Sequence, residues 1–421
     1  MKTLHITNAW HAFSGGIATF YRALIRAAET EQRPMVLVAP GERDGLEHIG
    51  DYGRIYKVRA PRAPFNRNYR FFLPHHYLLP GARVPQILRE EQPDLVEISD
   101  KYTLPYLAGL LRRGWLPGYA GRPTVVGLTC ERMDDNVTAY LIASDKVRGL
   151  VDLYLRWLYF PMCDHHIAVS RYTAEELERP SRGHRVWRGV WTSPMGVDCD
   201  AFRPDARRPE ARERLLARVD GGENTVLLLY CGRLAPEKNI SLLAELIEML
   251  APDASRDFRL LIAGDGILRE SFLADAAARV PGRVHWLGFV AGRNELAALY
   301  AGCDIFVHPN PAEPFGIAPM EAMAAGLPLV APDAGGVLAY ANASNAWLEP
   351  ARADRFAAAV RHIIEKPEER GQRVGRARDT AEQYSWPAVA SRYLKLYSQL
   401  DELTRGQQRV APEFPELNPV P

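Results

Sequence analysis

The sequence has few cysteines and no cysteine pair with C-x-x-C spacing. Five cysteines are dispersed singly over 421 residues. An odd, scattered set favours reduced thiols in a cytosol and argues against a disulfide framework or a zinc site. We therefore expect a cytoplasmic protein without a structural metal. The five are Cys130, Cys163, Cys199, Cys231 and Cys303.

An excess of charge and a long apolar run are also missing. Lys and Arg total 52 against 51 for Asp and Glu, which gives a formal charge of +1. This balance gives no whole-molecule attraction to nucleic acid, so we expect no nucleic-acid partner. No run approaches the length of a transmembrane helix. The first residues, MKTLHITNAWHAFSGG, lack the basic-then-apolar layout of a signal peptide.

Short apolar runs alternate with helical segments, and the pattern restarts after residue 200. This alternation is typical of parallel, doubly wound sheets and predicts two α/β domains. The expected strands of the first half are Thr3–Thr7, Met35–Ala39, Asp94–Ile98, Thr124–Leu128 and His166–Val169. Those of the second half are Val226–Tyr230, Arg259–Ala263, His285–Gly288, Ile305–Val307 and Leu329–Ala331.

Proline and glycine near Trp191–Asp205 mark the boundary between the two domains. We predict an N-terminal domain at 1–192 and a C-terminal domain at 193–385. A helix at 386–408 then crosses back to the first domain, and a proline-rich tail at 409–421 is disordered. Ligands of open α/β sheets bind beyond the carboxyl ends of strands, so we expect the functional residues in the loops that follow the strands.

One such loop, within Pro311–Val330, carries two carboxylates at a junction between loop and helix. Glu313 and Glu321 have seven residues between them. Free backbone N–H groups at the helix start favour phosphate, and Glu321 lies one turn further, within reach of a ribose or sugar hydroxyl. The N–H groups concerned are those near Gly316, Ile317 and Ala318.

Other interpretations of the two glutamates remain open. Glu313 is alternatively a solvated loop charge, although Pro311 and Phe315 suggest a constrained loop. Glu321 is alternatively half of a capping box, but the cap position is then Ala318, which has no side-chain oxygen.

The loop after Val226–Tyr230 reads CGRLAPEKNI and brings two cations to the mouth of that strand. These two side chains suit a diphosphate, because the Arg233 guanidinium can bind two oxygens at once and the Lys238 ammonium acts as a point charge. A solvated basic loop is the alternative.

Three glycine-containing loops also follow strands. Gly264-Asp265-Gly266 is equally typical of a tight turn. Phe289 and Val290, in Leu287–Val290, either border a nucleotide base or pack in the core. Ser14-Gly15-Gly16 lacks the G-x-G-x-x-G spacing of a dinucleotide site, but its glycines allow close backbone approach to a phosphate or sugar.

Together these motifs resemble the retaining family 4 glycosyltransferases (glycosyl transferases group 1) of the GT-B fold, over roughly residues 1–400. GT-B implies two Rossmann-like domains facing across a cleft. The motifs that carry the resemblance are SGGIATF from Ser14, DHHIAVSRYTAEEL from Asp164, MGVD from Met195, GRLAPEKN from Gly232, GDG from Gly264, LGFV from Leu287, E-x7-E from Glu313, and Gly335-Gly336.

The resemblance implies transfer of a sugar from an NDP-sugar donor to an acceptor hydroxyl, with an α-linked product. The acceptor attacks on the face that the diphosphate leaves, and clustered positive charge stabilises the leaving group. No metal or other cofactor is implied. The implied roles are diphosphate binding by Arg233 and Lys238 with the backbone of Gly316–Ala318, ribose binding by Glu321, sugar binding by Glu313, and phosphate approach by Gly16.

The chain departs from the family pattern on the acceptor side. Many members carry a His after the strand that corresponds to Thr124–Leu128, and here Cys130 occupies that position. A thiol does not fully replace His as a proton carrier, so acceptor handling is in question. The acceptor-side candidates are His11, Cys130, Glu131, Arg132 and Asp134.

The acceptor itself is a sugar, a lipid-linked sugar or a small molecule. The basic, aromatic segment Arg54–Phe72 fits peripheral contact with a membrane surface or a phosphorylated acceptor, and equally a solvated loop with buried aromatics. Two other functions remain: a different GT-B enzyme, such as an epimerase or phosphorylase, and a catalytically weak sugar-nucleotide-binding scaffold.

Overall fold

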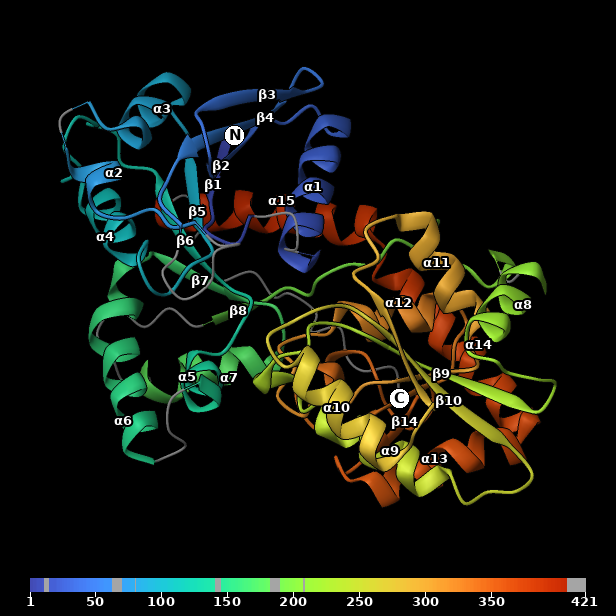
Figure 1. The fold of residues 1–421 in the computed structure, drawn as a ribbon. Helices are drawn as coiled ribbons and strands as arrows, with labels where there is room; N and C mark the ends of the chain where they lie inside the picture. The colour runs from blue at the N-terminus through green and yellow to red at the C-terminus, as the bar shows by residue number, and fades with distance from the viewer. Residues whose placement is uncertain are drawn as a thin grey trace. The chain divides into compact units, whose positions relative to one another are not determined.

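The computed structural model describes residues 1–10, 15–62, 70–79, 81–140, 145–181, 190–206 and 209–406 (Figure 1). The chain divides into two compact units. Among the described residues, one unit consists of 1–195 and 386–406, and the other of 196–385. The predicted tail at 409–421 lies outside the described residues. Among the described residues, every helix is too short or too polar to cross a membrane.

The first unit contains a mixed sheet in the order β3-β4-β2-β1-β5-β6-β7-β8. All neighbouring strands are parallel except β3, which runs antiparallel to β4. The five strands predicted for this half are confirmed. The strand bounds are β1 (Thr3–Ile6), β2 (Met35–Gly41), β3 (Gly45–Ile49), β4 (Gly53–Arg59), β5 (Leu95–Ile98), β6 (Thr124–Thr129), β7 (His165–Ala168) and β8 (Val190–Thr192).

Helices cover this sheet, with α1 packed against α15. The helix bounds are α1 (Gly15–Thr30), α2 (His75–Leu78), α3 (Arg83–Glu91), α4 (Pro105–Arg113), α5 (Met133–Tyr140), α6 (Asp145–Tyr154), α7 (Arg171–Ser181) and α15 (Trp386–Thr404). A π-helical turn, η1 (Leu155–Tyr159), continues α6.

Two segments that we expected to be irregular are strands. The first half of the basic segment forms β4, because Ile55, Tyr56 and Val58 are buried and Arg54 is paired with a carboxylate. The number of charges in this segment hid its apolar positions. The boundary region likewise contributes β8, which pairs in parallel with β7.

A buried carboxylate fastens α15 to the first unit. Glu97 on β5 accepts hydrogen bonds from Tyr21 Oη on α1 (2.9 Å) and from Tyr397 Oη on α15, and His5 Nδ1 lies 3.0 Å away. Thr124 Oγ1 donates to Asp401 at 2.7 Å further along the same helix. Since buried polar groups require partners, these bonds fix where α15 lies on the sheet.

The second unit is a parallel sheet in the order β11-β10-β9-β12-β13-β14. The five strands predicted for it are confirmed, and β14, three residues long, was not predicted. The strand bounds are β9 (Thr225–Cys231), β10 (Asp257–Ala263), β11 (Val284–Gly288), β12 (Ile305–Val307), β13 (Leu329–Pro332) and β14 (Trp347–Glu349).

Helices α9, α10 and α13 lie on one face of this sheet, and α8, α11, α12 and α14 on the other (Figure 1). Both faces of the sheet are thus covered, which explains its almost unbroken apolar strands. The helix bounds are α8 (Pro209–Arg218), α9 (Ser241–Leu250), α10 (Arg269–Arg279), α11 (Arg293–Gly302), α12 (Ile317–Ala324), α13 (Ala353–Glu365) and α14 (Pro367–Gln383).

Candidate active site

The pairing of β9 with β12 brings two sequence-distant loops together at the carboxyl edge of the second sheet. Ile305 is in register with Leu228, so the loops that follow the two strands leave the sheet side by side. Asn239, in the left-handed region at φ +50°, donates from Nδ2 to the carbonyl of Pro309 at 2.9 Å. The loops that carry Lys238 and Glu313 are therefore held against each other.

Glu313 lies at the centre of this contact. Its Oε2 accepts from Lys238 Nζ at 2.7 Å and from Asn310 Nδ2 at 3.0 Å, and it lies 3.7 Å from His308 Nε2. Burial alone raises the pKa of Glu313, but the Lys238 ammonium, together with His308 and Asn310, lowers it to about 2. Burial lowers the pKa of His308 to about 4. At neutral pH the cluster therefore holds one ammonium, one carboxylate and a neutral imidazole.

The helix α12 begins immediately beyond Glu313. Its N-cap residue, Gly316, has φ +89°, and no side chain caps the helix. The carbonyl of Gly316 accepts a 2.6 Å bond from Tyr340 Oη, and Phe315 is buried against the Tyr340 ring. The first N–H groups of α12, at Ile317 and Ala318, thus belong to an uncapped helix N-terminus, a site that favours anions.

Glu321 lies one turn further along α12. Its Oε2 accepts from Tyr300 Oη at 3.0 Å. Burial raises the pKa of Glu321 to about 7, while the Tyr300 bond and the charge of Arg293 act in the opposite direction and Asp198 acts in the same direction. Arg293 itself is paired with Asp198 at 2.5 Å. The carboxyl group of Glu321 is therefore poised between its two protonation states near neutral pH.

We expect this carboxyl group to make stability depend on pH. The folded protein binds the Glu321 proton more tightly than the unfolded chain does. The contribution of this proton to the free energy of unfolding is therefore complete below about pH 4.3 and is lost as pH rises through about 7. Over that range the free energy of unfolding of the unaltered protein should fall by roughly 1–3 kcal/mol, and Glu321→Gln should remove this fall. Thermal unfolding of both proteins against pH measures this. Parallel curves for the two would contradict the assignment.

Glycines permit two close loop approaches around the cluster. A Cβ at Gly264 would lie 1.9 Å from the carbonyl oxygen of Gly232, so the GDG loop packs directly on the loop of Arg233. A Cβ at Gly336 would lie 1.9 Å from the carbonyl oxygen of Pro314, and Gly336 N–H donates to the Glu313 carbonyl at 2.6 Å. The backbone of Glu313 is therefore held by Gly336.

Gly336→Ala is expected to displace the Glu313 loop, because backbone atoms cannot yield at 1.9 Å. We expect a loss of about 1–3 kcal/mol in stability and at least a tenfold weaker affinity for a sugar nucleotide. Calorimetric titration and urea unfolding test both. Gly371→Ala, on α14 with nothing within 4 Å, is the matched control; it should gain about 0.5–1 kcal/mol. Unaltered donor affinity in Gly336→Ala would count against the site.

Arg233, Phe289 and Val290 lie on neighbouring loops of the same edge. The Arg233 guanidinium is half exposed and lies 3.0 Å from Glu237. The loop after β11 is bound to the GDG loop, since Gly264 N–H donates to the Gly288 carbonyl at 2.8 Å. Phe289 is exposed and Val290 is partly buried, so Phe289 is not a core residue.

The acceptor-side candidates belong to the first unit. Gly16 lies in the first turn of α1, whereas His11 lies outside the described residues. Cys130 follows β6 directly, and burial, with Glu97 and Glu131 nearby, raises the pKa of its thiol. The thiol therefore keeps its proton at neutral pH and is a poor proton acceptor.

Arg132 and Asp134 are occupied by each other. Arg132 donates from Nε and a terminal nitrogen to the two Asp134 oxygens, at 3.0 and 2.7 Å, and these bonds hold the Asp134 pKa well below its usual range. Asp134 is buried and also pairs with Arg179 at 3.3 Å. Glu131 accepts a 3.0 Å bond from Asn136 on α5. The Arg132–Asp134 pair thus has a structural role, whereas Glu131 is partly buried and lies outside this pair.

The described part of the basic segment Arg54–Phe72 is largely neutralised. Arg54 pairs with Glu91 at 2.8 Å, and Arg62 and Arg70 both pair with Glu42. Phe72 is buried, and residues 63–69 lie outside the described part. The membrane role expected for this segment stays a prediction.

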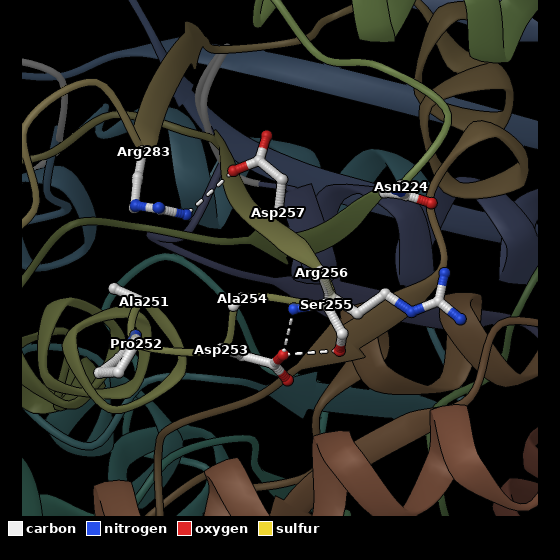
Figure 2. A pocket seen from close by; sticks show the side chains of 9 residues that line it. All are labelled: Asn224, Ala251, Pro252, Asp253, Ala254, Ser255, Arg256, Asp257 and Arg283. Atoms are coloured by element: carbon white, nitrogen blue, oxygen red, sulfur yellow. Dashed lines mark hydrogen bonds and ion pairs between the residues drawn. The ribbon is translucent and has the colours of Figure 1, made fainter.

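A surface hollow of about 430 Å³ lies at the opposite edge of the second sheet (Figure 2). Asn224 precedes β9 and Asp257 begins β10, so the hollow is at the amino ends of these strands. Arg283 pairs with Asp257 at 2.9 Å, and Ser255 Oγ donates to Asp253 at 2.6 Å. These four residues bind one another in two pairs, and the hollow lies away from the candidate site. The described residues contain no cluster of three or more metal-ligating side chains.

Three site residues were missed in the sequence: His308, Asn310 and Tyr300. His308 and Asn310 follow β12 directly, and this position at a strand end was the available signal. Tyr300 lies on α11, and no local pattern links it to Glu321.

Two family models match the chain, one for each half. The model described as Glycosyltransferase Family 4 matches residues 14–194, and the model described as Glycosyl transferases group 1 matches residues 212–380. The matched ranges fall within the two structural units.

Two relatives from Mycobacterium tuberculosis match along almost their full length. A GDP-mannose-dependent alpha-(1-6)-phosphatidylinositol dimannoside mannosyltransferase is 28% identical over 408 residues, covering 96% of this chain and 98% of the relative. A GDP-mannose-dependent alpha-mannosyltransferase is 30% identical over 408 residues, covering 93% and 90%.

Solved structures of glycosyltransferases share the fold. Sucrose-phosphate synthase from Thermosynechococcus elongatus has a TM-score of 0.72 at 18% identity, covering 95% of this chain and 99% of that one. Anabaena HepE in complex with UDP-glucose has a TM-score of 0.68 at 19% identity, covering 94% and 100%. The chain is therefore a glycosyltransferase enzyme of the GT-B fold and belongs to the family 4, group 1 glycosyltransferases.

Proposed function

We propose that this enzyme transfers mannose from GDP-mannose to a hydroxyl of a lipid-linked sugar, with retention of configuration and an α-linked product. The observation that carries the proposal is the Lys238–Glu313 pair, 2.7 Å apart, directly before the uncapped N-terminus of α12. The donor is the one named for both Mycobacterium tuberculosis relatives. The acceptor class follows the phosphatidylinositol dimannoside named for the first of them. The cytoplasm, where the free cysteines stay reduced, is the proposed location.

In this proposal the second unit binds the donor. Lys238, Arg233 and the first N–H groups of α12 hold the diphosphate, since all three present positive charge or oriented donors. Glu313 stays ionised because of its low pKa, and accepts hydrogen bonds from the sugar hydroxyls. Glu321 holds the ribose, and Phe289 with Val290 borders the base.

The chemical step follows from where charge develops. As the bond between sugar and diphosphate breaks, negative charge grows on the phosphate oxygens, and the preorganised Lys238 ammonium and α12 N-terminus stabilise it. The acceptor hydroxyl attacks on the same face, and its proton passes to the leaving phosphate. Cys130 need not carry that proton, which fits its raised pKa. The proposal includes no metal ion and leaves Gly16 as the donor contact of the first unit.

A panel of GDP-mannose, GDP-glucose, UDP-glucose, ADP-glucose and dTDP-glucose tests the donor. We expect the largest thermal stabilisation with GDP-mannose, and slow release of GDP from it without acceptor. Stabilisation only by UDP- or ADP-sugars would overturn the guanine and mannose assignment but keep the diphosphate site. An inverted product anomer in NMR spectra of the complete reaction would overturn retention.

A further inference from the structure

The continuous helical segment formed by α6 and η1 is apolar on two faces. Its inner face buries Val151, Leu155 and Tyr159 against Met133 of α5 and Leu177 of α7. This spacing of four residues already satisfies the packing of the helix on its own unit. In Figure 1 α6 lies at the margin of the first unit, next to α5 and α7.

The outer face carries three large apolar side chains that are more than half exposed. Leu150, Leu153 and Trp157 are 66%, 56% and 61% exposed. Their spacing of three and then four residues aligns them in one stripe along the helix. Scattered exposed apolar residues are ordinary, but three large ones in one helical stripe mark an interaction surface.

Positive charge accompanies the stripe. Lys146 and Arg148 are exposed before Leu150, and Arg156 lies against the Trp157 ring, 5.4 Å from its centroid. Within the described part of the chain, Lys146 and Arg148 form no ion pair, and Asp152 is paired with Arg179 at 2.5 Å. Burial raises the pKa of Asp135 and the charge of Arg148 acts in the opposite direction, but Lys146 and Arg148 are both exposed and can meet an anionic partner.

We infer that the α6–η1 stripe docks this enzyme on the surface of an anionic phospholipid membrane. Leu150, Leu153 and Trp157 enter the interface between headgroups and acyl chains, and Lys146 and Arg148 contact the anionic headgroups. An apolar stripe edged by cations and carrying Trp is the composition of helices that lie in that interface. An apolar surface of a partner protein or a second copy explains the stripe but not the adjacent Lys146 and Arg148, which form no ion pair with any described residue.

The fold connects this stripe to the acceptor side of the same unit. Tyr154 Oη, between Leu153 and Leu155 on the helix, donates to the Lys101 carbonyl at 2.6 Å. Lys101 Nζ in turn donates to the Glu131 carbonyl at 2.6 Å. Docking through α6 and η1 therefore fixes the height of the loop containing Glu131 above the membrane. The inference uses only the first unit and does not depend on which donor is used.

Flotation with vesicles of phosphatidylcholine, alone or mixed with phosphatidylglycerol, tests the proposal on the full chain without any donor. We expect the unaltered protein to bind the anionic vesicles. Binding of Leu153→Ser/Trp157→Ser should be weaker by roughly tenfold or more, because each substitution removes the free energy gained when an apolar side chain enters the interface. Lys146→Gln/Arg148→Gln should weaken binding and reduce its dependence on salt. GDP release from GDP-mannose in solution should be unchanged in both variants, which separates this surface from the donor site.

The matched control is Trp115→Ser, because Trp115 is 69% exposed but lies beyond the end of α4. It should bind vesicles as the unaltered protein does. The proposal is overturned if the unaltered protein fails to float with anionic vesicles, or if Leu153→Ser/Trp157→Ser floats equally well. A dimer in sedimentation that only Leu153→Ser/Trp157→Ser dissociates would assign the stripe to a second copy instead.

Discussion

Lys238→Met is expected to lower kcat by about 10³-fold, the cost of removing one preorganised group that stabilises developing negative charge. The substitution keeps most of the side-chain volume and removes the ammonium that lies 2.7 Å from Glu313. Because Glu313 then loses its main cation, its pKa should rise from about 2. The acidic limb of the kcat profile should move to higher pH accordingly. Steady-state kinetics with GDP-mannose at several pH values measure both effects.

The control for this variant is Lys366→Met. Lys366 is an exposed lysine of the same unit that follows α13. It should leave kcat unchanged, which separates the loss of one particular ammonium from the loss of any positive charge. If Lys238→Met turned over at the rate of the unaltered enzyme, the leaving-group role of Lys238 would be wrong.

Lys101→Met is expected to destabilise the first unit by about 3–5 kcal/mol, because it leaves a buried charge without its counter-ion. Lys101 is 2% exposed and donates to Glu176, which is fully buried. The other oxygen of Glu176 accepts the Asp134 N–H, at 2.9 Å. Urea unfolding followed by hydrogen exchange of the first unit measures the loss.

The second variant for this pair replaces both charges. Lys101→Met/Glu176→Leu should recover most of the lost stability, since an apolar pair of similar volume is often neutral or better than a buried ion pair. Lys57→Met, which breaks an exposed pair with Glu47 at 3.8 Å, should change stability by at most about 1 kcal/mol. A double variant as unstable as Lys101→Met would show that packing, not the charge, is the cause.

The strands and the junction between loop and helix at Glu313 and Glu321 could be predicted because their signals are local. Val226–Tyr230 and Arg259–Ala263 are apolar runs of strand length, and Glu313 and Glu321 lie on either side of a helix start. The contact between Lys238 and Glu313 depends on the pairing of β9 with β12, whose first paired residues, Leu228 and Ile305, are 77 positions apart. Neither segment shows by itself which strand will be its neighbour. The segment of β4 was misread because paired arginines look the same in a sequence as free ones.

The pKa of Glu321 is a second property that could not be predicted from the sequence. Sequence places this carboxyl on the first turns of α12, but its proton affinity is set by burial and by Tyr300 from α11. Similarly, Arg132 and Asp134 read as loop charges near a strand end, and only the folded unit shows that they neutralise one another. Residue types identify the family of reactions, while long-range packing decides which charges remain available.

The bonds from Glu97 to α15 have a consequence for biosynthesis. The first unit is discontinuous in the chain: it needs Trp386–Thr404, which the ribosome makes only after the whole of Gly196–Ser385. The later half can therefore finish folding first, while Glu97 and the side of α1 that packs on α15 still lack this helix. A chain that stops at Ser385 keeps Lys238, Glu313 and Glu321, yet it leaves the earlier half incomplete.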